Sequence, residues 1–331
     1  MKLAIIGATG LVGRKMIEIV FERGIELSEL YLGASDRSAN KVISINGKAY
    51  RIDHVPDILS LKPDVALFSA GSNVSYEYAP QFADNGCFVI DNSSVWRLHD
   101  HIPLVVPEIN SQYLSRDNKI IANPNCSTIQ LVMVLYPLHQ LYGLKRVTIS
   151  TYQSVSGSGK KGIDQLISER KGLKAEPVYA YPIDFNCFPH GGKFLDNGYS
   201  TEEMKLLDES RKILDLPDLE VAATVVRIPV IGGHSESVSI EFDNEVNLEE
   251  VIYTLSNFPG IKLENDSQQN IYPMPLTVFN RDEVFVGRIR KDLSRSNILH
   301  LWIVADNVRK GAATNAVQIL QKLIEQNIVN V

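Results

Sequence analysis

The sequence is poor in cysteine: it has three, Cys87, Cys126 and Cys187, widely spaced along 331 residues. Such spacing provides neither a disulfide framework nor a CxxC metal signature. We therefore expect no structural disulfide and no bound metal.

A surplus of basic residues is also missing, since the formal net charge is -6. This balance argues against a general nucleic-acid binder, because phosphate contacts need clustered Lys and Arg; a small anionic substrate needs only a local basic pocket. No apolar run approaches the length of a membrane span. The apolar start at residues 1–6 is broken by Gly7, Gly10 and Gly13 too early for a signal peptide. We expect a soluble, cytoplasmic protein with no nucleic-acid or membrane partner.

What is present is the composition of an ordinary globular protein, with 44% hydrophobic and 22% charged residues. The length favours two domains around a sizeable core. We find no internal repeats and no low-complexity segments.

A glycine motif opens the chain. It lies between a short apolar strand, residues 2–6, and a helix from about residue 11 to residue 23 whose apolar residues recur at helical spacing. The motif, G-x-x-G-x-x-G, is a variant of the dinucleotide fingerprint, in which glycine lets the backbone approach a pyrophosphate at the helix N-terminus. The residues expected to contact a cofactor here are Gly7, Thr9, Gly10, Leu11, Val12 and Gly13.

The residues after the second predicted strand, Glu29–Leu32, bear on the choice between NAD and NADP. An acid at this place usually holds the ribose hydroxyls of NAD, whereas a nearby Arg accommodates the 2′-phosphate of NADP. Arg37, flanked by Ser35 and Ser38, makes a good phosphate cradle. Asp36 alone is the weaker ribose clamp, so NADP is favoured. The alternative is a solvated turn whose charges face water.

Strands and helices continue to alternate, with strands at residues 65–70 and 87–90 and a helix through residues 76–83. This alternation predicts an α/β fold with a doubly wound parallel sheet, in which ligands lie beyond the carboxyl ends of the strands. Arg97 follows a polar cluster at one such end, where it can reach an anionic group. A surface arginine is the alternative interpretation.

The hexapeptide at residues 123–128, Asn-Pro-Asn-Cys-Ser-Thr, separates a β-like run from an apolar run of helical length. Pro124 forbids a helix before it, so Cys126 is expected in the first turn of a helix. Backbone N–H groups and the helix dipole favour the thiolate there, and the thiolate is the nucleophilic form. The alternative is a buried structural cysteine, since a catalytic one needs a His from elsewhere in the fold.

The pattern changes after this helix, and we place the domain boundary near Asn125. Residues 146–154 alternate β-branched and polar side chains, which is typical of a half-exposed strand. A strand-like run, Val221–Val230, carries Arg227 in an apolar setting. His234 follows two glycines and precedes another strand, which makes it the candidate partner of a thiolate.

Two more helices are expected. Thr201 is the predicted N-cap of a helix that begins at Glu202. After a final strand at residues 299–305, a helix with small residues on one face suits close packing against another element, and the first domain is the predicted one.

Together these motifs resemble those of NADP-dependent bacterial aspartate-β-semialdehyde dehydrogenases over essentially the whole length. The resemblance implies a Rossmann-like doubly wound N-terminal sheet plus an α+β catalytic and dimerisation domain, an architecture like that of glyceraldehyde-phosphate dehydrogenase. The first domain would comprise residues 1–125 with 308–331 and the second residues 126–307, in a homodimer. The motifs that carry the resemblance are residues 7–13, 123–128, 153–159, 227–230, 233–236 and 306–313.

The resemblance also implies the reaction, which is the reductive dephosphorylation of L-aspartyl 4-phosphate to L-aspartate 4-semialdehyde by NADPH. This step leads to lysine and diaminopimelate, methionine and threonine. Cys126 would be the nucleophile that forms a thioacyl intermediate, His234 the acid/base, and Gln153 the residue that orients the intermediate. Arg227 would pair with the substrate α-carboxylate and Glu202 with its amine. The phosphate site would be lined by Arg97, Asn125 and Lys205, and further cofactor contacts would come from Ser156, Gly157 and Asn307.

An acyl phosphate suits this set of residues, because it is a thiolate target with a good leaving group. Attack produces a tetrahedral oxyanion, which we expect N–H groups at the start of the Cys126 helix to stabilise by roughly 3–4 kcal/mol. A substrate with two anionic ends and one cation needs Arg, Lys and Glu around it, and the planar Arg fork binds both oxygens of a carboxylate.

Two other interpretations stay open. An N-acetylglutamyl-phosphate reductase has a similar architecture, but its substrate amine is uncharged, which would leave Glu202 without a role, and its motif typically reads Pro-Gly-Cys. A non-catalytic nucleotide-binding paralogue would usually lose the nucleophile, whereas this chain keeps Cys126 together with Gln153 and His234.

Overall fold

The computed structural model describes residues 1–35 and 38–330. Contacts divide the chain into two compact units, of which unit 1 comprises Met1–Pro124 and Ala312–Val331 and unit 2 comprises Asn125–Gly311. In the described part of the chain, no helix is long and apolar enough to cross a membrane.

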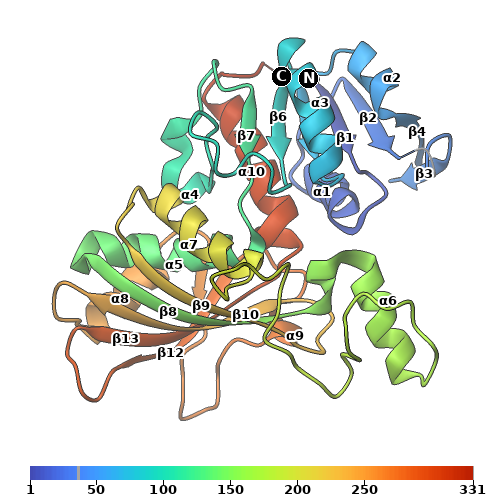
Figure 1. Ribbon diagram of the computed structural model, residues 1–331. Coiled ribbons are helices and arrows are strands. Elements are labelled where there is room, and N and C mark those ends of the chain that lie inside the picture. Colours follow the sequence, from blue (N-terminus) through green and yellow to red (C-terminus); the bar gives the residue numbers. More distant parts are fainter. Residues whose placement is uncertain (36–37, 331) are drawn as a thin grey trace. The chain divides into compact units, whose positions relative to one another are not determined.

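Unit 1 alternates strands and helices along the chain, and its last helix comes from the C-terminal segment, drawn in red among blue and cyan elements in Figure 1. The strands are β1 (Lys2–Ile6), β2 (Glu29–Ala34), β3 (Val42–Ile45), β4 (Lys48–His54), β5 (Val65–Phe68), β6 (Phe88–Asp91) and β7 (Ile120–Ala122). The helices are α1 (Leu11–Glu22), α2 (Val55–Ser60), α3 (Ser72–Asp84), α4 (Pro107–Asn110), the 3₁₀ turn η1 (Ser111–Tyr113) and α10 (Thr314–Glu325).

The described strands of unit 1 form a seven-stranded sheet in the order β3-β4-β2-β1-β5-β6-β7. The pairs from β4 through to β7 are parallel, and the β3–β4 hairpin is antiparallel. Starting from β1, the chain builds the sheet first toward one edge and then toward the other. This is the doubly wound order, and the predicted fold class is confirmed.

Strand β5 shows why helices are needed on both faces of this sheet, because all four of its residues are buried. Leu67 belongs to a core cluster that includes residues of α1 and α10. Its neighbour Phe68 packs edge-on against Phe82 of α3, with 5.3 Å between the ring centroids. Since successive side chains of a strand point to opposite faces, α1 and α10 cover one face and α3 covers the other.

Unit 2 is built around a second sheet. Its strands are β8 (Leu144–Gln153), β9 (Glu220–Arg227), β10 (His234–Phe242), β11 (Ile261–Leu263), β12 (Val284–Lys291) and β13 (Ile298–Ala305). Its helices are α5 (Cys126–Tyr142), α6 (Gly159–Arg170), α7 (Thr201–Leu214), α8 (Leu248–Asn257) and α9 (Pro275–Val278), with the 3₁₀ turn η2 (Val155–Ser158); the π-helical turn η3 (Arg309–Ala313) leads out of the unit.

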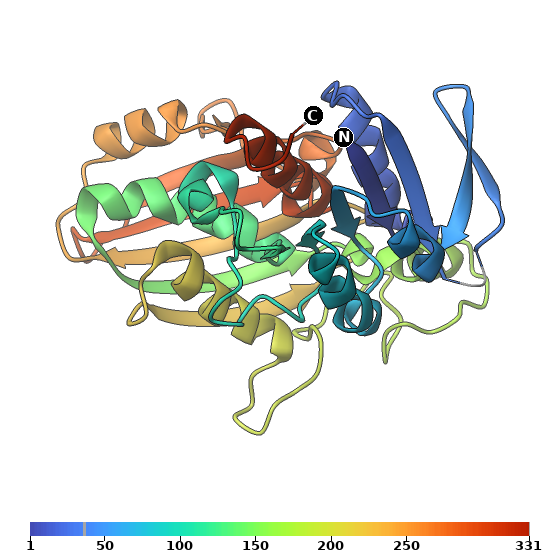
Figure 2. The same ribbon diagram turned by 90° about the horizontal axis from the view of Figure 1, so that it is seen from above.

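The described strands of unit 2 form a six-stranded sheet in the order β11-β12-β13-β10-β8-β9. Its centre is antiparallel, with β10 between β13 and β8, and β9 is added parallel to β8. Helices α5, α7 and α8 lie over one face (Figures 1 and 2). The other face carries Tyr152 and Trp302, whose rings are tilted by 51° with 5.4 Å between their centroids. Alternation along β8 therefore turns Thr151 and Gln153 toward the helices.

The start of α7 differs from the prediction. The N-cap is Ser200, whose hydroxyl accepts a hydrogen bond from the Glu203 backbone N–H, while the Glu203 carboxylate accepts one from the Ser200 N–H at 2.7 Å. Thr201 is the first helical residue, and its hydroxyl accepts from Lys193 instead. Ser200 is favoured because Glu203 stands three residues after it, the spacing of a capping box.

Candidate active site

Cys126 is the first residue of α5, as the sequence predicts. Asn125 before it is extended and is the N-cap, and its side-chain oxygen accepts hydrogen bonds from the N–H groups of Ser127 at 3.0 Å and Thr128 at 3.4 Å. Cys126 is half-buried, whereas the two residues after it are fully buried. The positive end of the helix dipole at this place stabilises a thiolate.

The cap changes one expectation about this helix start. The N–H groups of Ser127 and Thr128 are engaged by Asn125, and the N–H of Ile129 donates to the Asn125 carbonyl oxygen at 2.9 Å. The first turn was expected to supply donors for an oxyanion, and for Ser127 and Thr128 that expectation is wrong. A capping Asn competes for the same N–H groups as a ligand would.

Glycine at position 311 allows the chain to pass close to the nucleophile candidate. A Cβ on Gly311 would lie 2.9 Å from the Cβ of Cys126 and 3.3 Å from its Cα. Any side chain here would displace the start of α5. The Gly311 N–H donates to the carbonyl oxygen of Asp306, which holds this segment in place.

Gln153 ends β8 next to the same helix start. Its side-chain NH₂ donates to the Ser127 hydroxyl at 3.0 Å, and the side chain is 2% exposed. This bond aligns Gln153 with the residue that follows Cys126.

His234 is the first residue of β10 and is fully buried. Its Nδ1 accepts a hydrogen bond from the backbone N–H of Ser154 at 3.1 Å and lies 3.1 Å from the Ser154 hydroxyl. The preceding Gly233 has φ +83°, and a Cβ there would lie 2.9 Å from the Cα of Pro275. The turn before His234 therefore requires glycine, and it fixes where the ring enters the strand.

The electrostatic surroundings keep His234 neutral. Burial lowers the pKa of His234 well below its usual range, and the positive charge of Arg227 lowers it further, against a smaller opposing effect of the Gly233 backbone. Among the described residues, Nε2 has no hydrogen-bond partner.

Arg227 and His234 are both hydrogen-bonded to Ser154. The Arg227 guanidinium Nη1 donates to the Ser154 carbonyl oxygen at 2.6 Å, and Arg227 is 6% exposed. A Cβ on Gly157 would lie 2.8 Å from that Nη1 and 3.2 Å from the His234 Nε2. The missing side chain at position 157 thus leaves space next to both groups. Arg227 also lines a cavity of about 390 Å³ together with Tyr179, Tyr181, Phe188, His190 and Phe194.

Asn307 holds this arrangement together. Its Oδ1 accepts from the Gly233 N–H and from the hydroxyls of Ser154 and Ser156, each at 3.1 Å, and its NH₂ donates to Ser156 at 3.0 Å. The backbone N–H of Gly233 can only donate, so the oxygen of the Asn307 amide faces it.

Helix α7 supplies a second group of charged residues, and Glu202, Lys205 and Glu209 recur on it at helical spacing. Glu202 forms an ion pair with Lys205 and accepts from the Asn125 side-chain NH₂ at 3.0 Å. Glu209 is 1% exposed and accepts from the Asn125 backbone N–H at 2.6 Å. Two carboxylates of α7 therefore hold the residue that caps α5.

In unit 1, the glycine motif forms a tight turn between β1 and α1. Gly7 has φ +94°, and a Cβ on it would lie 2.3 Å from the Ser69 carbonyl oxygen; one on Gly13 would lie 2.2 Å from the Gly7 carbonyl oxygen. Helix α1 begins after Gly10 with no side-chain cap and no acid in its first turn. Backbone N–H groups and a helix dipole without a competing carboxylate fit a pyrophosphate.

Only some of the residues that were expected to determine the preference for NAD or NADP belong to the described part of the chain. The Ser38 N–H donates to the Ser35 carbonyl oxygen at 2.8 Å, and Asp36 and Arg37 lie outside the described residues. Arg97, also in unit 1, is 6% exposed and donates to the carbonyl oxygens of Asn92 and Asn123, both at 2.9 Å. The interpretation of Arg97 as a surface arginine is wrong.

The hydrogen bonds of unit 2 thus connect most of the candidate residues of that unit into two adjoining networks. One joins Asn125 to Glu202 and Lys205; the other joins His234, Arg227, Ser156 and Asn307 through Ser154, beside Gln153. Sequence reasoning missed Ser154, Glu209 and Gly311. Glu209 had a signal, since it lies one helical turn beyond Lys205, but Ser154 acts through its backbone and has none.

Two family models match the chain. The model described as "Semialdehyde dehydrogenase, NAD binding domain" matches residues 2–116, and the one described as "Semialdehyde dehydrogenase, dimerisation domain" matches residues 135–310.

Proteins similar to this chain carry a consistent description. Aspartate-semialdehyde dehydrogenase of Aquifex aeolicus is 48% identical over 99% of each chain, and that of Bacillus subtilis is 44% identical over 99% of this chain and 98% of the relative. Among solved structures, aspartate semialdehyde dehydrogenase II from Vibrio cholerae complexed with ASA has a TM-score of 0.93 at 44% identity over 98% of each chain. The Candida albicans enzyme with NADP has a TM-score of 0.79 at 26% identity, over 99% of this chain and all of that one.

Proposed function

The chain belongs to the aspartate-semialdehyde dehydrogenase family, and from this premise we propose that it converts L-aspartyl 4-phosphate to L-aspartate 4-semialdehyde with release of phosphate. The observation that carries the proposal is the position of Cys126 at the start of α5, beside a network that ends in a buried His and a buried Arg. A thiolate, a hydrogen-bonding His and a carboxylate-binding Arg are what acyl transfer from an aspartyl phosphate requires.

Each side chain has a part in this reaction. The Cys126 thiolate attacks the acyl carbon and forms a thioester, and Gln153, fixed by Ser127, orients it. His234 acts on the oxygen of the reacting carbonyl group. Arg227 binds the substrate α-carboxylate through its planar fork, and Glu202 binds the α-ammonium. The phosphate group is bound by Arg97, Asn125 and Lys205.

The cofactor is a nicotinamide nucleotide, since unit 1 matches a NAD-binding domain and its uncapped glycine turn fits a pyrophosphate. When bound it supplies the hydride that reduces the thioester. Residues 7–13 hold the pyrophosphate, with Ser156, Gly157 and Asn307 at the nicotinamide end. The nucleotide is NADP, because Arg37 between Ser35 and Ser38 receives a 2′-phosphate; the Candida albicans relative with NADP supports this choice.

The assembly is a homodimer. The family model that matches residues 135–310 is a dimerisation domain, and the sheet face of unit 2 opposite α5, α7 and α8 carries the apolar surface of Tyr152 and Trp302. The proposed location is the cytoplasm, where this biosynthetic step has its substrates; fractionation of cells tests that.

The reverse reaction tests the activity. Aspartate semialdehyde, phosphate and NADP are mixed with the protein and NADPH absorbance is followed, with NAD in a parallel assay. We expect NADPH formation that depends on phosphate. No signal with either nucleotide, from folded protein with a titratable Cys126, contradicts the proposal and leads to N-acetylglutamate semialdehyde as the next substrate and then to a non-catalytic role.

A further inference from the structure

Strands β6 and β7 end side by side, and each is followed by an asparagine. The two strands pair in parallel with Asp91 opposite Ala122, so Asn92 and Asn123 are the first residues beyond the paired register. In a parallel sheet, ligands bind beyond the carboxyl ends of the strands. Arg97 returns to this place from the segment after β6. Its Nε donates to the Asn123 carbonyl oxygen and its Nη2 to the Asn92 carbonyl oxygen, both at 2.9 Å.

These two bonds determine the orientation of the Arg97 guanidinium. Nε and Nη2 lie on one edge of this planar group, so two acceptors on that edge fix its plane and the direction of its fork. Backbone carbonyl groups carry no net charge, and they orient the cation without neutralising it. Arg97 is only 6% exposed. An arginine that is ordered before an anion arrives loses less side-chain entropy when the anion binds.

The side chain of Asn123 is bonded at both ends within unit 1. Its NH₂ donates to Asn92 Oδ1 at 2.7 Å and to the Ala312 carbonyl oxygen at 3.1 Å, and its Oδ1 accepts from the Asn315 NH₂ at 2.7 Å. The Ala312 carbonyl can only accept, which fixes the orientation of the amide. Asn123 and Asn315 are fully buried. A carboxylate at position 123 would lack the two donors, and an apolar side chain would lack all three bonds.

The Asn123 amide therefore holds both acceptors of Arg97. It bonds the side chain of Asn92 directly, and the Asn123 backbone N–H donates to the Asp91 carbonyl oxygen at 2.8 Å. The two carbonyl oxygens belong to neighbouring strands whose pairing ends one residue earlier. Without the amide bridge, nothing beyond that last pair would connect the two residues through their side chains.

The segment that carries Arg97 has anchors of its own. The Ser93 hydroxyl donates to the Asp91 carboxyl group, and the Trp96 indole N–H donates to the Ser75 hydroxyl at 2.8 Å. These bonds do not involve Asn123. Loss of the Asn123 amide should therefore leave the backbone of this segment in place and release the orientation of the guanidinium.

We propose that Asn123 is a positioning residue for phosphate recognition, because its amide holds in register the two carbonyl oxygens that orient Arg97. The proposal rests on the proposed function, in which Arg97 binds phosphate, and adds to it the residue that aims this arginine. Asn123 acts through Arg97 and needs no contact with the substrate.

Steady-state kinetics of the reverse reaction test the proposal. Asn123→Ala should raise the KM for phosphate roughly tenfold or more, while the KM values for aspartate semialdehyde and NADP change less than about twofold. Asn110→Ala is the matched control, because Asn110 is 3% exposed in the same unit and bonds the backbone of Leu104 and Val106, both at 2.9 Å. Both variants should lower the melting temperature, but the control should leave the phosphate KM unchanged. Equal changes in all three KM values for Asn123→Ala overturn the proposal.

Asn92→Ala is a milder variant, which keeps the test decisive if Asn123→Ala fails to fold. Asn92 is half-buried, and the substitution removes the acceptor of one Asn123 N–H while it keeps the backbone carbonyl that binds Arg97. The phosphate KM should rise roughly three- to tenfold. An unchanged phosphate KM in Asn92→Ala overturns the proposal.

Chemical rescue examines the two carbonyl oxygens themselves. Arg97→Ala removes the atoms of an ethylguanidinium ion and leaves its two acceptors, so millimolar ethylguanidinium should restore part of the phosphate-dependent rate. With Asn123→Ala added, half-maximal rescue should need roughly tenfold more of this ion, because the acceptors are no longer held in register. With Asn110→Ala added, rescue should match that of Arg97→Ala alone. Absence of rescue in Arg97→Ala, or equal rescue with and without the Asn123 amide, overturns the proposal.

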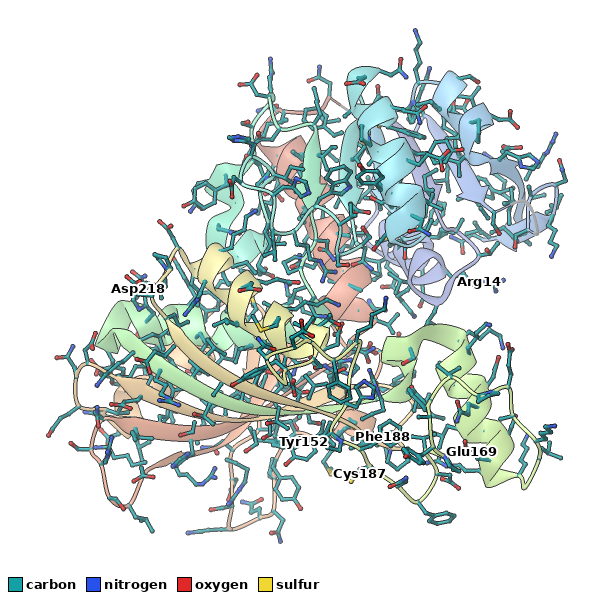
Figure 3. The ribbon with its side chains drawn as sticks, in the orientation of Figure 1. Arg14, Tyr152, Glu169, Cys187, Phe188 and Asp218 are labelled. Carbon is teal, nitrogen blue, oxygen red and sulfur yellow. The ribbon has the colours of Figure 1, made fainter. Side chains whose placement is uncertain are left out.

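The hold on Arg97 is also measurable without turnover. Its Nε–H is observed by ¹H–¹⁵N correlation and assigned as the signal missing from Arg97→Lys. Arg14 provides the comparison, because it is an exposed residue at the surface of unit 1 whose Nε donates to the Thr9 carbonyl oxygen at 3.3 Å (Figure 3). We expect the Arg97 Nε–H to exchange with water at least roughly tenfold more slowly than that of Arg14.

The variants should change this exchange rate selectively. Asn123→Ala should bring the exchange of the Arg97 Nε–H close to that of Arg14, whereas Asn110→Ala should not. An unchanged rate in Asn123→Ala overturns the proposal. If the wild-type protein forms no NADPH at all, the proposed function fails, while the exchange rate still decides whether Asn123 holds Arg97.

Discussion

Helices α1 and α5 both follow a short strand, and both start at a place where ligand chemistry is proposed, but their N-termini are built differently. Helix α1 has Gly10 as its N-cap, with no side-chain cap and no acid in the first turn. In α5 the Asn125 side chain caps the N–H groups of Ser127 and Thr128. Helix α1 therefore leaves its first backbone N–H groups available to an anion. Helix α5 has its first N–H groups bonded to Asn125, and it presents the Cys126 side chain instead.

The interiors beneath the two helices differ as well. Helix α1 packs through Met16, Ile19 and Val20 into an apolar cluster. One turn into α5, the fully buried Gln130 faces a polar interior that also contains Glu236, on the strand of His234. A nucleotide is recognised through backbone geometry that an apolar core keeps rigid, whereas a nucleophile needs neighbouring side chains, which make the interior polar.

The largest effect is expected for Cys126→Ala, which removes the side chain that α5 presents. Turnover should fall by roughly 10³-fold or more, as when a catalytic nucleophile is lost. The fold should persist, since Asn125 still caps the helix. NADPH formation in the reverse assay measures turnover, and thermal unfolding measures whether the fold persists. Comparable turnover by the variant would remove the covalent mechanism.

Gly7→Ala tests the backbone site of α1. The new Cβ would meet the Ser69 carbonyl oxygen at 2.3 Å in a conformation with positive φ, so the turn must shift and nucleotide binding should weaken at least tenfold. Titration of NADPH fluorescence measures this.

Gly24→Ala is the matched control, because Gly24 also has positive φ but a Cβ there meets nothing within 4 Å. It should cost about 1–2 kcal/mol of stability and leave nucleotide affinity unchanged. Equal weakening of affinity by both variants would show that general strain, and not the glycine turn, is responsible. Alkylation of Cys126 should be unaffected in either variant.

Arg227→Leu should raise the KM for aspartate semialdehyde by roughly ten- to a hundredfold, the equivalent of about 1.5–3 kcal/mol for a hydrogen bond to a charged group. NADP binding should change far less. Arg227→Lys keeps the charge without the planar fork, so its KM for aspartate semialdehyde should lie between those of the wild type and Arg227→Leu. Steady-state kinetics with both substrates measure the difference, and equal losses of both would argue against a carboxylate role.

Glu236→Gln tests the polar interior beneath α5. Because burial raises the folded pKa of Glu236, its contribution to stability is complete below the unfolded value of 4.5 and is lost as the pH rises toward the folded pKa, at about 1.4 kcal/mol per unit. The variant cannot ionise, so it should become more stable than the wild type as the pH is raised from 5 to 8 in urea titrations.

Glu241→Gln, on the same strand and paired with Lys145 at a partly exposed site, is the control and should change stability little. A stability gap between wild type and Glu236→Gln that does not grow with pH would mean that Glu236 is ionised in the folded protein.

The smallest effect is expected for Asn125→Ala, which makes the start of α5 resemble the uncapped start of α1. Loss of an Asn N-cap costs about 1 kcal/mol. Asn247→Ala removes the corresponding cap of α8, which bonds the Glu249 N–H at 3.0 Å, and should cost a similar amount. Only Asn125→Ala should also shift the pH midpoint of Cys126 alkylation. A shift in both variants, or in neither, would show that the Asn125 cap has no specific effect on the Cys126 thiol.

Much of unit 1 was predictable because its order is local. The strand, glycine turn and helix of residues 2–22 follow one another in the chain, and the periodicity of their apolar residues indicates each element. The position of Cys126 was predictable for the same reason, since Pro124 and the apolar run on either side define the start of α5. The Thr201 cap failed because two adjacent hydroxyl residues compete, and the carboxylate of Glu203 decides between them.

By itself, the sequence determined the fold class, the nucleotide turn, the family and the helix start that carries Cys126, because each depends on residues close together in the chain. Only the tertiary structure decided that Glu209 holds Asn125 and that the Ser154 N–H contacts the His234 ring. These contacts join residues far apart in sequence, or pass through backbone atoms that every residue possesses. No pattern of side chains along the chain records them, and folding alone brings the partners within hydrogen-bond distance.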